Sequence, residues 1–286
     1  MNLSVKCRLC FLLSRALGEG VWWFVVDDIG LIATVRKRCF VLGTPIDTLT
    51  WDATLDRLFA WGRGRESRYV CICNVHSVVT ATQDTEFGRV VNQADMVTPD
   101  GAPVAWMLRR LGSAGQQRIN GPDLMWRYCE QAQTRDEAIF FYGSTEQTLV
   151  KLKARLLAAF PGLKIAGAIS PPFRALTPAE DEDIVAQINA SGAGVVWVSL
   201  GCPKQELWMA AHRGRINAVM VGVGAAFDYH AGTIKRAPKW MQDCGLEWLH
   251  RLVSEPRRLW KRYLVTNSLF VLGAARQLLT ERIKKQ

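Results

Sequence analysis

Asp100 is the carboxylate whose surroundings in the sequence best suit acid–base chemistry. It follows Pro99, precedes Gly101 and stands just after a predicted strand at 94–98. A carboxylate with an ordinary pKa of about 3.9 is ionised at neutral pH and can take the proton of a hydroxyl nucleophile. A simple Pro-Asp-Gly turn explains the same residues, because these residue types favour turn geometry. The residues alone leave both readings open.

A second group of residues could hold a diphosphate. Gly201 ends another predicted strand, and Lys204 and Gln205 begin the helix after it. The free N–H groups of a helix start, next to a lysine, suit phosphate oxygens. Arg118 lies outside any helical pattern and could contact a phosphate or orient Asp100. The segment is not a P-loop, because the pattern Gly-x-x-x-x-Gly-Lys-Ser/Thr is absent.

Polar residues and glycines also follow the other predicted strands. Ligands of open parallel sheets bind beyond these strand ends, although single glycines also simply terminate strands. Asp228 could bind a ribose or sugar hydroxyl or cap a helix, and Asp123 could likewise serve only as a cap. The remaining candidates for substrate binding are Asn74, His76, Gly101, Asn120, Gly143 and Gly224.

The histidines and cysteines do not indicate a metal centre. His212, His230 and His250 lack metal-ligand spacing, and Cys7 and Cys10 form a lone CxxC pair without the further ligands that zinc needs. We therefore expect neither a metal nor a cofactor. The eight cysteines lie scattered in apolar stretches, which predicts reduced thiols.

A scaffold that gathers the strand ends is needed to bring these residues together. Short apolar runs alternate with helix-spaced segments from residue 39 onward. This alternation predicts an α/β fold with a Rossmann-like parallel sheet and helices on both faces. The expected strands are 39–43, 69–73, 94–98, 138–142, 163–168, 195–200 and 218–223. The expected helices are 48–61, 103–111, 122–132, 149–160, 178–189 and one after 201–203.

The net charge of +10 is concentrated at the C-terminus. From Lys235 onward there are twelve basic and four acidic residues, a net charge of +8, so the preceding part is nearly neutral. Pro256 is expected to divide this tail into two short helices in which Trp and Leu alternate with basic residues. Such helices typically lie on an anionic bilayer, although a helical cap on the sheet is the alternative. We assign membrane or diphosphate contacts to Arg251, Arg257, Arg258, Lys261 and Arg262.

Three segments follow from these patterns. Residues 1–38 form an N-terminal extension, 39–234 the α/β domain and 235–286 a basic amphipathic helical appendage that binds membranes. The apolar runs near the N-terminus are too short to span a bilayer, so integral insertion is not expected. Nucleic acid is not an expected partner, because no recognition motif accompanies the basic residues.

Six blocks of residues together resemble the WecG/TagA/CpsF glycosyltransferase family, family 26, over about residues 39–264. The resemblance implies an inverting hexosyltransferase that moves a sugar from a UDP-sugar to a polyprenyl-diphosphate-linked saccharide. It also implies a peripheral enzyme at the cytoplasmic face of the bacterial inner membrane, whose C-terminal appendage binds the membrane and helps to close the site. The blocks are Asn74, 98–101, 118–124, 201–206, 222–228 and 245–248.

The resemblance also implies roles for particular residues. The aspartate matching Asp100 is the family's proposed general base, and no catalytic metal is required. The residues matching Asn74, Arg118 and Gln205 belong to the sugar-nucleotide site. Ile72 stands where well-studied members carry threonine, which leaves the donor open among UDP-N-acetylmannosamine, its uronic acid and UDP-glucose.

Two other functions compete with this interpretation. A sugar epimerase or dehydrogenase that uses a dinucleotide could adopt the same scaffold, although 222–226 lacks the third glycine of the fingerprint. A non-enzymatic protein that binds lipid-linked glycan is the other. The pathway, whether exopolysaccharide or another cell-surface polysaccharide, and the oligomeric state, with a dimer or trimer among the options, stay open.

Overall fold

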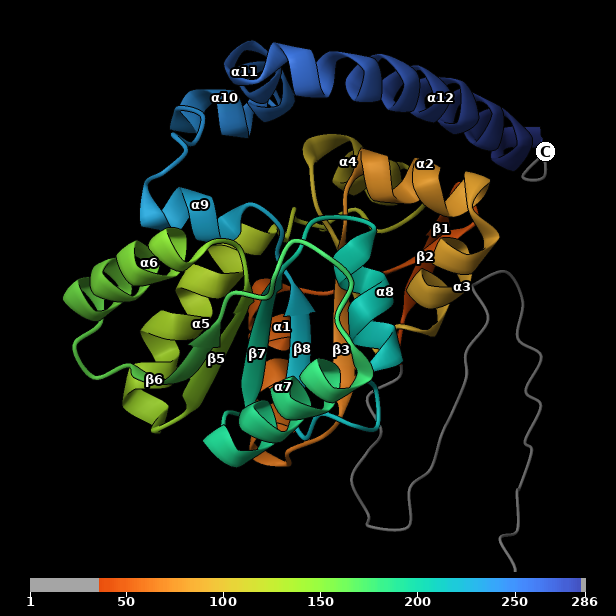
Figure 1. Cartoon of the computed structure of the whole chain (residues 1–286). Helices are drawn as coiled ribbons and strands as arrows, with labels where there is room; N and C mark the ends of the chain where they lie inside the picture. The colour runs from red at the N-terminus through yellow and green to blue at the C-terminus, as the bar shows by residue number, and fades with distance from the viewer. Residues whose placement is uncertain (1–35, 284–286) are drawn as a thin grey trace, which may run out of the picture. The chain divides into compact units, whose positions relative to one another are not determined.

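The computed structural model describes residues 36–283, so the expected N-terminal extension and its CxxC pair lie almost wholly outside the described part. A six-stranded sheet dominates the unit that begins at Arg38 (Figure 1). All neighbouring strands are parallel, in the order β4-β3-β8-β7-β5-β6, which confirms the predicted α/β fold. The strands are β3 (Arg68–Cys73), β4 (Met96–Pro99), β5 (Ala138–Gly143), β6 (Lys164–Ile169), β7 (Val195–Ser199) and β8 (Val219–Gly222).

Helices cover both faces of the sheet because the central strands are apolar on both sides. In β7, Val196 and Val198 enter one buried cluster, and Val195 and Trp197 enter the other. Such continuous apolar runs are typical of strands in doubly covered parallel sheets. One face carries α2 (Val75–Gln83), α3 (Thr85–Gln93), α4 (Ala102–Arg110), α7 (Pro178–Ser191) and α8 (Lys204–Ala211). The other carries α1 (Trp51–Arg63), α5 (Gly121–Arg135), α6 (Glu146–Ala159) and α9 (Ala226–Ala231).

The predicted strand at 39–43 forms but pairs outside the main sheet, and two helices were missed. The segment 39–43 does not join the parallel sheet, because β1 (Arg38–Val41) pairs antiparallel with β2 (Thr44–Asp47) in a separate hairpin. Leu42 and Gly43 both adopt positive φ in its two-residue turn, as tight hairpins require. The sequence reasoning also missed α2 and α3. Valine and threonine are frequent in α2 and weaken the helical signal, but Asn74 and Asp84 cap the two helices.

The tail forms α10 (Lys239–Asp243), α11 (Glu247–Ser254) and α12 (Pro256–Ile283). Pro256 separates two helices as predicted, but the expectation that both are short is wrong, because α12 has 28 residues. Proline is tolerated at this position because the first N–H groups of a helix need no helical partner. None of the described helices combines the length and the apolar character needed to cross a membrane.

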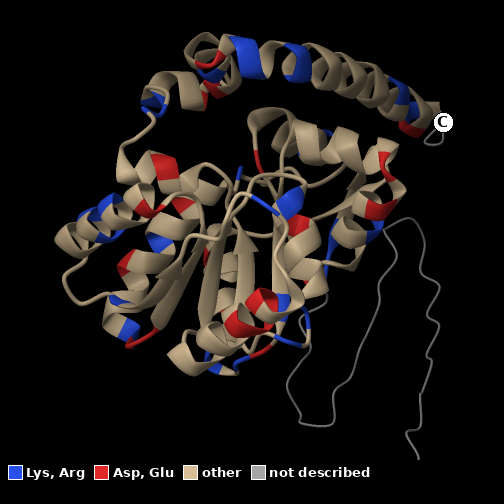
Figure 2. Ribbon diagram, in the orientation of Figure 1, with Lys and Arg blue, Asp and Glu red and all other residues tan. Residues whose placement is uncertain are grey.

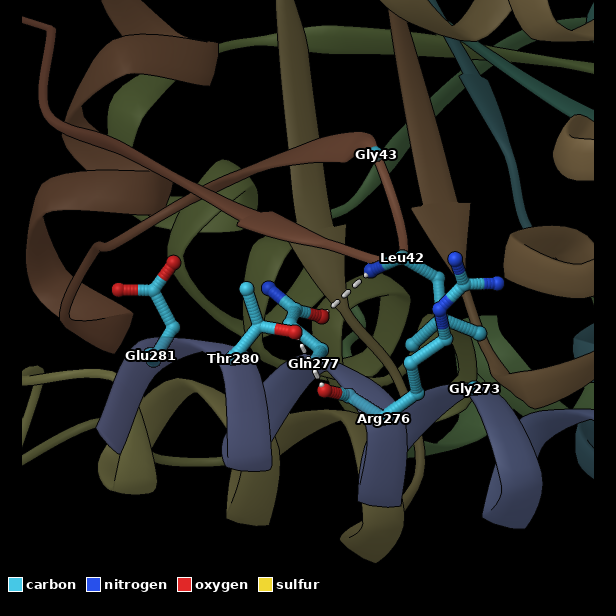
Figure 3. A pocket seen from close by; sticks show the side chains of 7 residues that line it. All are labelled: Leu42, Gly43, Gly273, Arg276, Gln277, Thr280 and Glu281. Atoms are coloured by element: carbon cyan, nitrogen blue, oxygen red, sulfur yellow. Dashed lines mark hydrogen bonds between the residues drawn. The ribbon is translucent and has the colours of Figure 1, made fainter. Parts of the chain in front are cut away.

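The second half of α12 is fastened to the hairpin. Phe270 and Ala274 are buried in the apolar cluster that also contains residues of α2. The Leu42 backbone N–H donates to Gln277 Oε1 at 2.9 Å (Figure 3). Gln277 Nε2 also donates to the Phe40 carbonyl at 2.6 Å. A shallow surface pocket of about 310 Å³ lies at this junction. It is formed by other residues than those predicted for the site.

Candidate active site

Asp100 stands at the carboxyl end of β4. Its backbone N–H donates to the Cys73 carbonyl at 2.9 Å, which fixes it beside the end of β3. Gly101 follows with a φ of 81° and allows the chain to turn into α4. Only a quarter of the Asp100 side chain is exposed. The predicted base therefore lies at the expected edge of the sheet, partly shielded from solvent.

Arg118 reaches Asp100 from the loop before α5. The neighbouring Ile119 N–H donates to the Pro99 carbonyl at 2.9 Å and holds this loop against β4. Arg118 Nε lies 3.8 Å from Asp100 Oδ1, while its Nη2 donates to Glu247 Oε2 at 2.7 Å. The predicted pairing of Arg118 with Asp100 is thus present, but the closer carboxylate comes from α11.

Arg236 extends this network on its other side. It donates to both carboxylate oxygens of Asp123 and, at 3.3 Å, to Asn120 Oδ1. Its Nε also lies 3.5 Å from Glu247 Oε1. Asn120 additionally caps α5 by accepting the Asp123 N–H at 2.9 Å, so the cap is Asn120 and not the predicted Asp123. Asn120 and Asp123 hold Arg236, and Arg236 helps to hold the tail.

The two aspartates of this network have opposite pKa shifts. Burial raises the pKa of Asp100, and the Arg118 guanidinium opposes this rise without cancelling it. Burial also acts on Asp123, but the hydrogen bonds from Arg236 and Asn120 outweigh it and lower the pKa of Asp123. A carboxylate with a raised pKa is the better proton acceptor, so Asp100 is the basic member of the pair.

The start of α8 is built around Gln205. Its Oε1 accepts the Gly224 N–H at 3.1 Å, and its Nε2 donates to Glu206 Oε1 at 2.9 Å. A Cβ on Gly222 would lie 3.0 Å from Gln205 Nε2, closer than an ordinary van der Waals contact, so glycine leaves room for this side chain. Gly201 turns into the helix with a φ of 77°, and the Lys204 side chain is exposed.

Glu206 is a buried carboxyl group with one unpartnered oxygen. The residue is 1% exposed, and Oε2 has no hydrogen-bond partner among the described residues. Burial raises the pKa of Glu206. Burial thus favours the neutral carboxyl group of Glu206. Its Oε1 accepts from the Gln205 amide and fixes the orientation of that amide. Sequence reasoning included Glu206 in a motif but gave it no role.

Asn74 and His76 begin α2 at the end of β3. Asn74 Oδ1 accepts the Ser77 N–H at 3.2 Å and caps the helix. His76 Nδ1 lies 3.4 Å from Thr80 Oγ1, and burial together with the Arg262 guanidinium lowers the pKa of His76 to about 4. Arg262 of α12 is thus an electrostatic neighbour of the strand edge, and His76 stays neutral at physiological pH.

Gly143 and Asp228 have clear structural explanations. A Cβ on Gly143 would lie 2.4 Å from the Ser199 carbonyl, so the close approach of the ends of β5 and β7 requires glycine. Asp228 Oδ1 accepts a hydrogen bond from Thr233 Oγ1 at 3.0 Å. Asp228 lies within the first turn of α9, whose N-cap is Ala225 and has no side-chain bond, so the predicted alternative of a helix cap is wrong.

The predicted cationic residues of the tail separate into two groups. Arg257, Arg258 and Lys261 are exposed, and Arg258 pairs with Glu255. Arg251 and Arg262 are half-buried, and the Nε of each is enclosed without a hydrogen-bond partner in the described chain. The Arg251 guanidinium lies 5.7 Å from the Tyr229 ring of α9. The second group therefore points toward the sheet and the first toward solvent.

Two residues of the site escaped prediction. Arg236 was only one of twelve tail cations, and Glu247 appeared only within the block 245–248. The sequence signal that could have found Glu247 is that it is an acidic residue near the start of an otherwise basic tail. Within residues 36–283, no group of three or more His, Cys, Asp and Glu side chains could hold a metal ion. The expectation that no metal is needed stays a prediction.

These features define a class of protein. A basic carboxylate, guanidinium groups and a helix start at the edge of a parallel sheet are typical of enzymes that transfer a group from a phosphorylated donor. Residues 39–284 match the Glycosyl transferase WecG/TagA/CpsF family, and the chain belongs to this family. It is a glycosyltransferase, so the epimerase or dehydrogenase and the non-enzymatic alternatives are wrong. No strand follows β8, so the 222–226 segment opens no dinucleotide-binding βαβ unit in the described chain.

A curated relative supports the same class. A Bacillus spizizenii protein named N-acetylglucosaminyldiphosphoundecaprenol N-acetyl-beta-D-mannosaminyltransferase is 32% identical over 197 residues. The match covers 68% of this chain and 74% of that protein.

Proposed function

We propose that this chain is an inverting glycosyltransferase that moves a sugar from a UDP-sugar to a polyprenyl-diphosphate-linked saccharide. The observation that carries the proposal is the raised pKa of Asp100 at the sheet edge, next to Arg118. The name of the Bacillus spizizenii relative supports an acceptor of the N-acetylglucosaminyl-diphosphate-lipid type. The product would enter the synthesis of exopolysaccharide or another cell-surface polysaccharide.

In the proposed mechanism, Asp100 takes the proton of the acceptor hydroxyl as its oxygen attacks the anomeric carbon. The bond from that carbon to the UDP oxygen breaks on the opposite face, and UDP leaves with the bonding electrons. One displacement inverts the anomeric configuration. The pKa of Asp100 is raised but that of an ordinary hydroxyl is far higher, so proton transfer accompanies attack instead of preceding it.

The negative charge that develops on UDP needs cationic or N–H partners. The start of α8 offers the Lys204 backbone N–H, whereas the Gln205 N–H already donates to the Gly201 carbonyl at 2.9 Å. Arg251 and Arg262 offer enclosed Nε–H groups without partners in the described chain. Donors fixed in place before the reaction stabilise such charge effectively. We assign the diphosphate to these groups and propose that they make a catalytic metal unnecessary.

Transfer assays with the purified full-length chain test the reaction. UDP-N-acetylmannosamine is the first donor to test, beside its uronic acid and UDP-glucose, with a short-chain N-acetylglucosaminyl-diphosphate-lipid as acceptor. Asp100→Asn should lower UDP release by about 100-fold or more, the usual contribution of a general base, while the thermal melt stays cooperative. NMR of the product should show an inverted anomeric configuration. Near-wild-type turnover of the variant would exclude Asp100 as the base.

The tail provides a surface for a membrane that carries the acceptor lipid. Lys and Arg residues gather at the two ends of α12, and residues 263–275 contain none (Figure 2). We propose that this surface holds the enzyme peripherally on an anionic leaflet at the cytoplasmic face. Its exposed apolar side chains are Trp260, Leu264, Val265, Leu269, Val271, Leu272, Leu279 and Ile283.

Vesicle flotation tests the membrane proposal. Basic residues near an anionic surface contribute about 1 kcal/mol each, so replacing Arg257, Arg258 and Lys261 by glutamine should weaken binding by roughly 100-fold. Binding should require phosphatidylglycerol and be lost on phosphatidylcholine alone. Equal flotation of both vesicle types would contradict the proposal.

A further inference from the structure

Within the described part of the tail, Glu247 is the only carboxylate that contacts the Asp100–Arg118 pair. Its Oε2 accepts from Arg118 Nη2 at 2.7 Å, and its Oε1 lies 3.5 Å from Arg236 Nε. The side chains of Glu247 and Arg118 are 19% and 17% exposed. This is a shielded ion pair between α11 and the loop that holds Arg118, so water screens it less than an ordinary surface pair.

The backbone of the tail is fitted closely at the same place. Gly245, two residues before Glu247, has a φ of 73°, and a Cβ there would lie 2.7 Å from the Ala102 Cβ at the start of α4. Ala102 is two residues after Asp100. The path of the tail is therefore set directly beside the base, and only glycine permits this approach.

Arg118 has two carboxylates within reach and bonds to one. Its distance to Glu247 is that of a charge-assisted hydrogen bond, whereas the 3.8 Å to Asp100 is too long for one. A guanidinium that bonded directly to Asp100 would stabilise the carboxylate and make it a poorer base. The contact with Glu247 thus leaves the basic oxygen of Asp100 without that bond.

We propose that Glu247 is a positioning residue of the transfer reaction: it holds the Arg118 guanidinium away from Asp100, so that the base keeps its full strength. The inference rests on the proposed role of Asp100 as general base. It goes beyond closure of the site by the tail, because it assigns one tail carboxylate an effect on the strength of the base.

The charges around Asp100 all predict the same direction of change. Besides Arg118 and Glu247, the groups that face Asp100 are Arg236, the Gly101 N–H and the Cys73 thiol of β3. Neutralising Glu247 removes a charge that raises the pKa of Asp100. It also weakens the hold on both guanidinium groups, which lower that pKa. Both effects lower it, so the base becomes weaker.

The pH profile of Glu247→Gln tests the inference with the full chain. Removing a nearby charge shifts a pKa by about one unit, so the acid limb of kcat/KM should move to lower pH by about that amount. The plateau of kcat should fall roughly three- to tenfold, because a weaker base transfers the proton less effectively. Glu247→Asp keeps the charge with a shorter reach, and its limb should move in the same direction by less.

Asp243→Asn is the matched control, because it removes one tail carboxylate that pairs with the exposed Lys239 four residues away. Its acid limb should stay at the wild-type pH. If both Glu247 variants lose turnover with an unmoved limb, the residue is merely structural and the inference is overturned. If Glu247→Gln fails to fold, the limb of Glu247→Asp decides alone. Active Asp100→Asn would instead overturn the proposed base itself.

Discussion

Replacing Phe270 by alanine tests how α12 is held against the rest of the unit. Phe270 is 4% exposed and belongs to the buried cluster that contains Val78 and Val79 of α2. Truncating a buried phenylalanine costs about 3–5 kcal/mol. The other buried residues of α12 are few, namely Leu259, Thr266 and Ala274. The free energy lost on truncating Phe270 is therefore a large part of the packing free energy of α12. We expect the helix to open locally while the sheet stays folded.

Hydrogen exchange followed by mass spectrometry measures this opening peptide by peptide. Since about 1.4 kcal/mol corresponds to a tenfold change, amides of α12 should exchange roughly 100- to 4000-fold faster in Phe270→Ala. Amides of β7 and β8 should keep their wild-type rates. Val271→Ala is the matched control, because the neighbouring Val271 is 64% exposed. Equal acceleration in α12 and the central strands would refute the reasoning, since docking and global folding would then be one event.

Two further predictions concern buried titratable groups. Because the pKa of Glu206 is raised in the folded state, its stabilising contribution is complete below its unfolded pKa of about 4.3 and is lost as the pH rises toward the folded value. Thermal melts of Glu206→Gln and the wild type from pH 4 to 9 measure this effect. Between the unfolded and the folded pKa of Glu206, the stability of the variant relative to the wild type should increase by about 1.4 kcal/mol per pH unit. A stability difference that does not change with pH would contradict the prediction. Arg262→Gln should raise the pKa of His76 from about 4 toward 6.5 in an imidazole NMR titration, while His230, whose pKa is lowered by burial and Arg236, should not change.

The catalytic half of the site was predictable because its geometry follows from local signals. Asp100 and Gln205 come directly after apolar strands, and parallel strands bring their carboxyl ends to one edge. Once alternation predicts a parallel sheet, these residues must meet. The strand at 39–43 did not follow this rule: it pairs with β2 in a hairpin and not with the parallel sheet. An isolated apolar run does not reveal which strand it will pair with.

The tail half of the site depends on contacts between distant parts of the chain. Glu247 bonds to Arg118 across 129 residues, and Arg236 bonds to Asp123 across 113. Composition identifies the tail as basic and amphipathic but gives no information on which charge faces inward. Arg262 and Arg257 are five residues apart, yet one faces His76 and the other is exposed to solvent.

The sequence by itself determined the order of strands and helices along most of the chain, the residues at the strand ends and the family. It could do so because periodicity, turn residues and motifs are encoded within short segments. Only the tertiary structure decided that α12 packs on α2 and the hairpin, and that Glu247 stands between two guanidinium groups beside the base. Those contacts depend on which buried faces fit each other across the whole unit, and a single sequence does not display that fit.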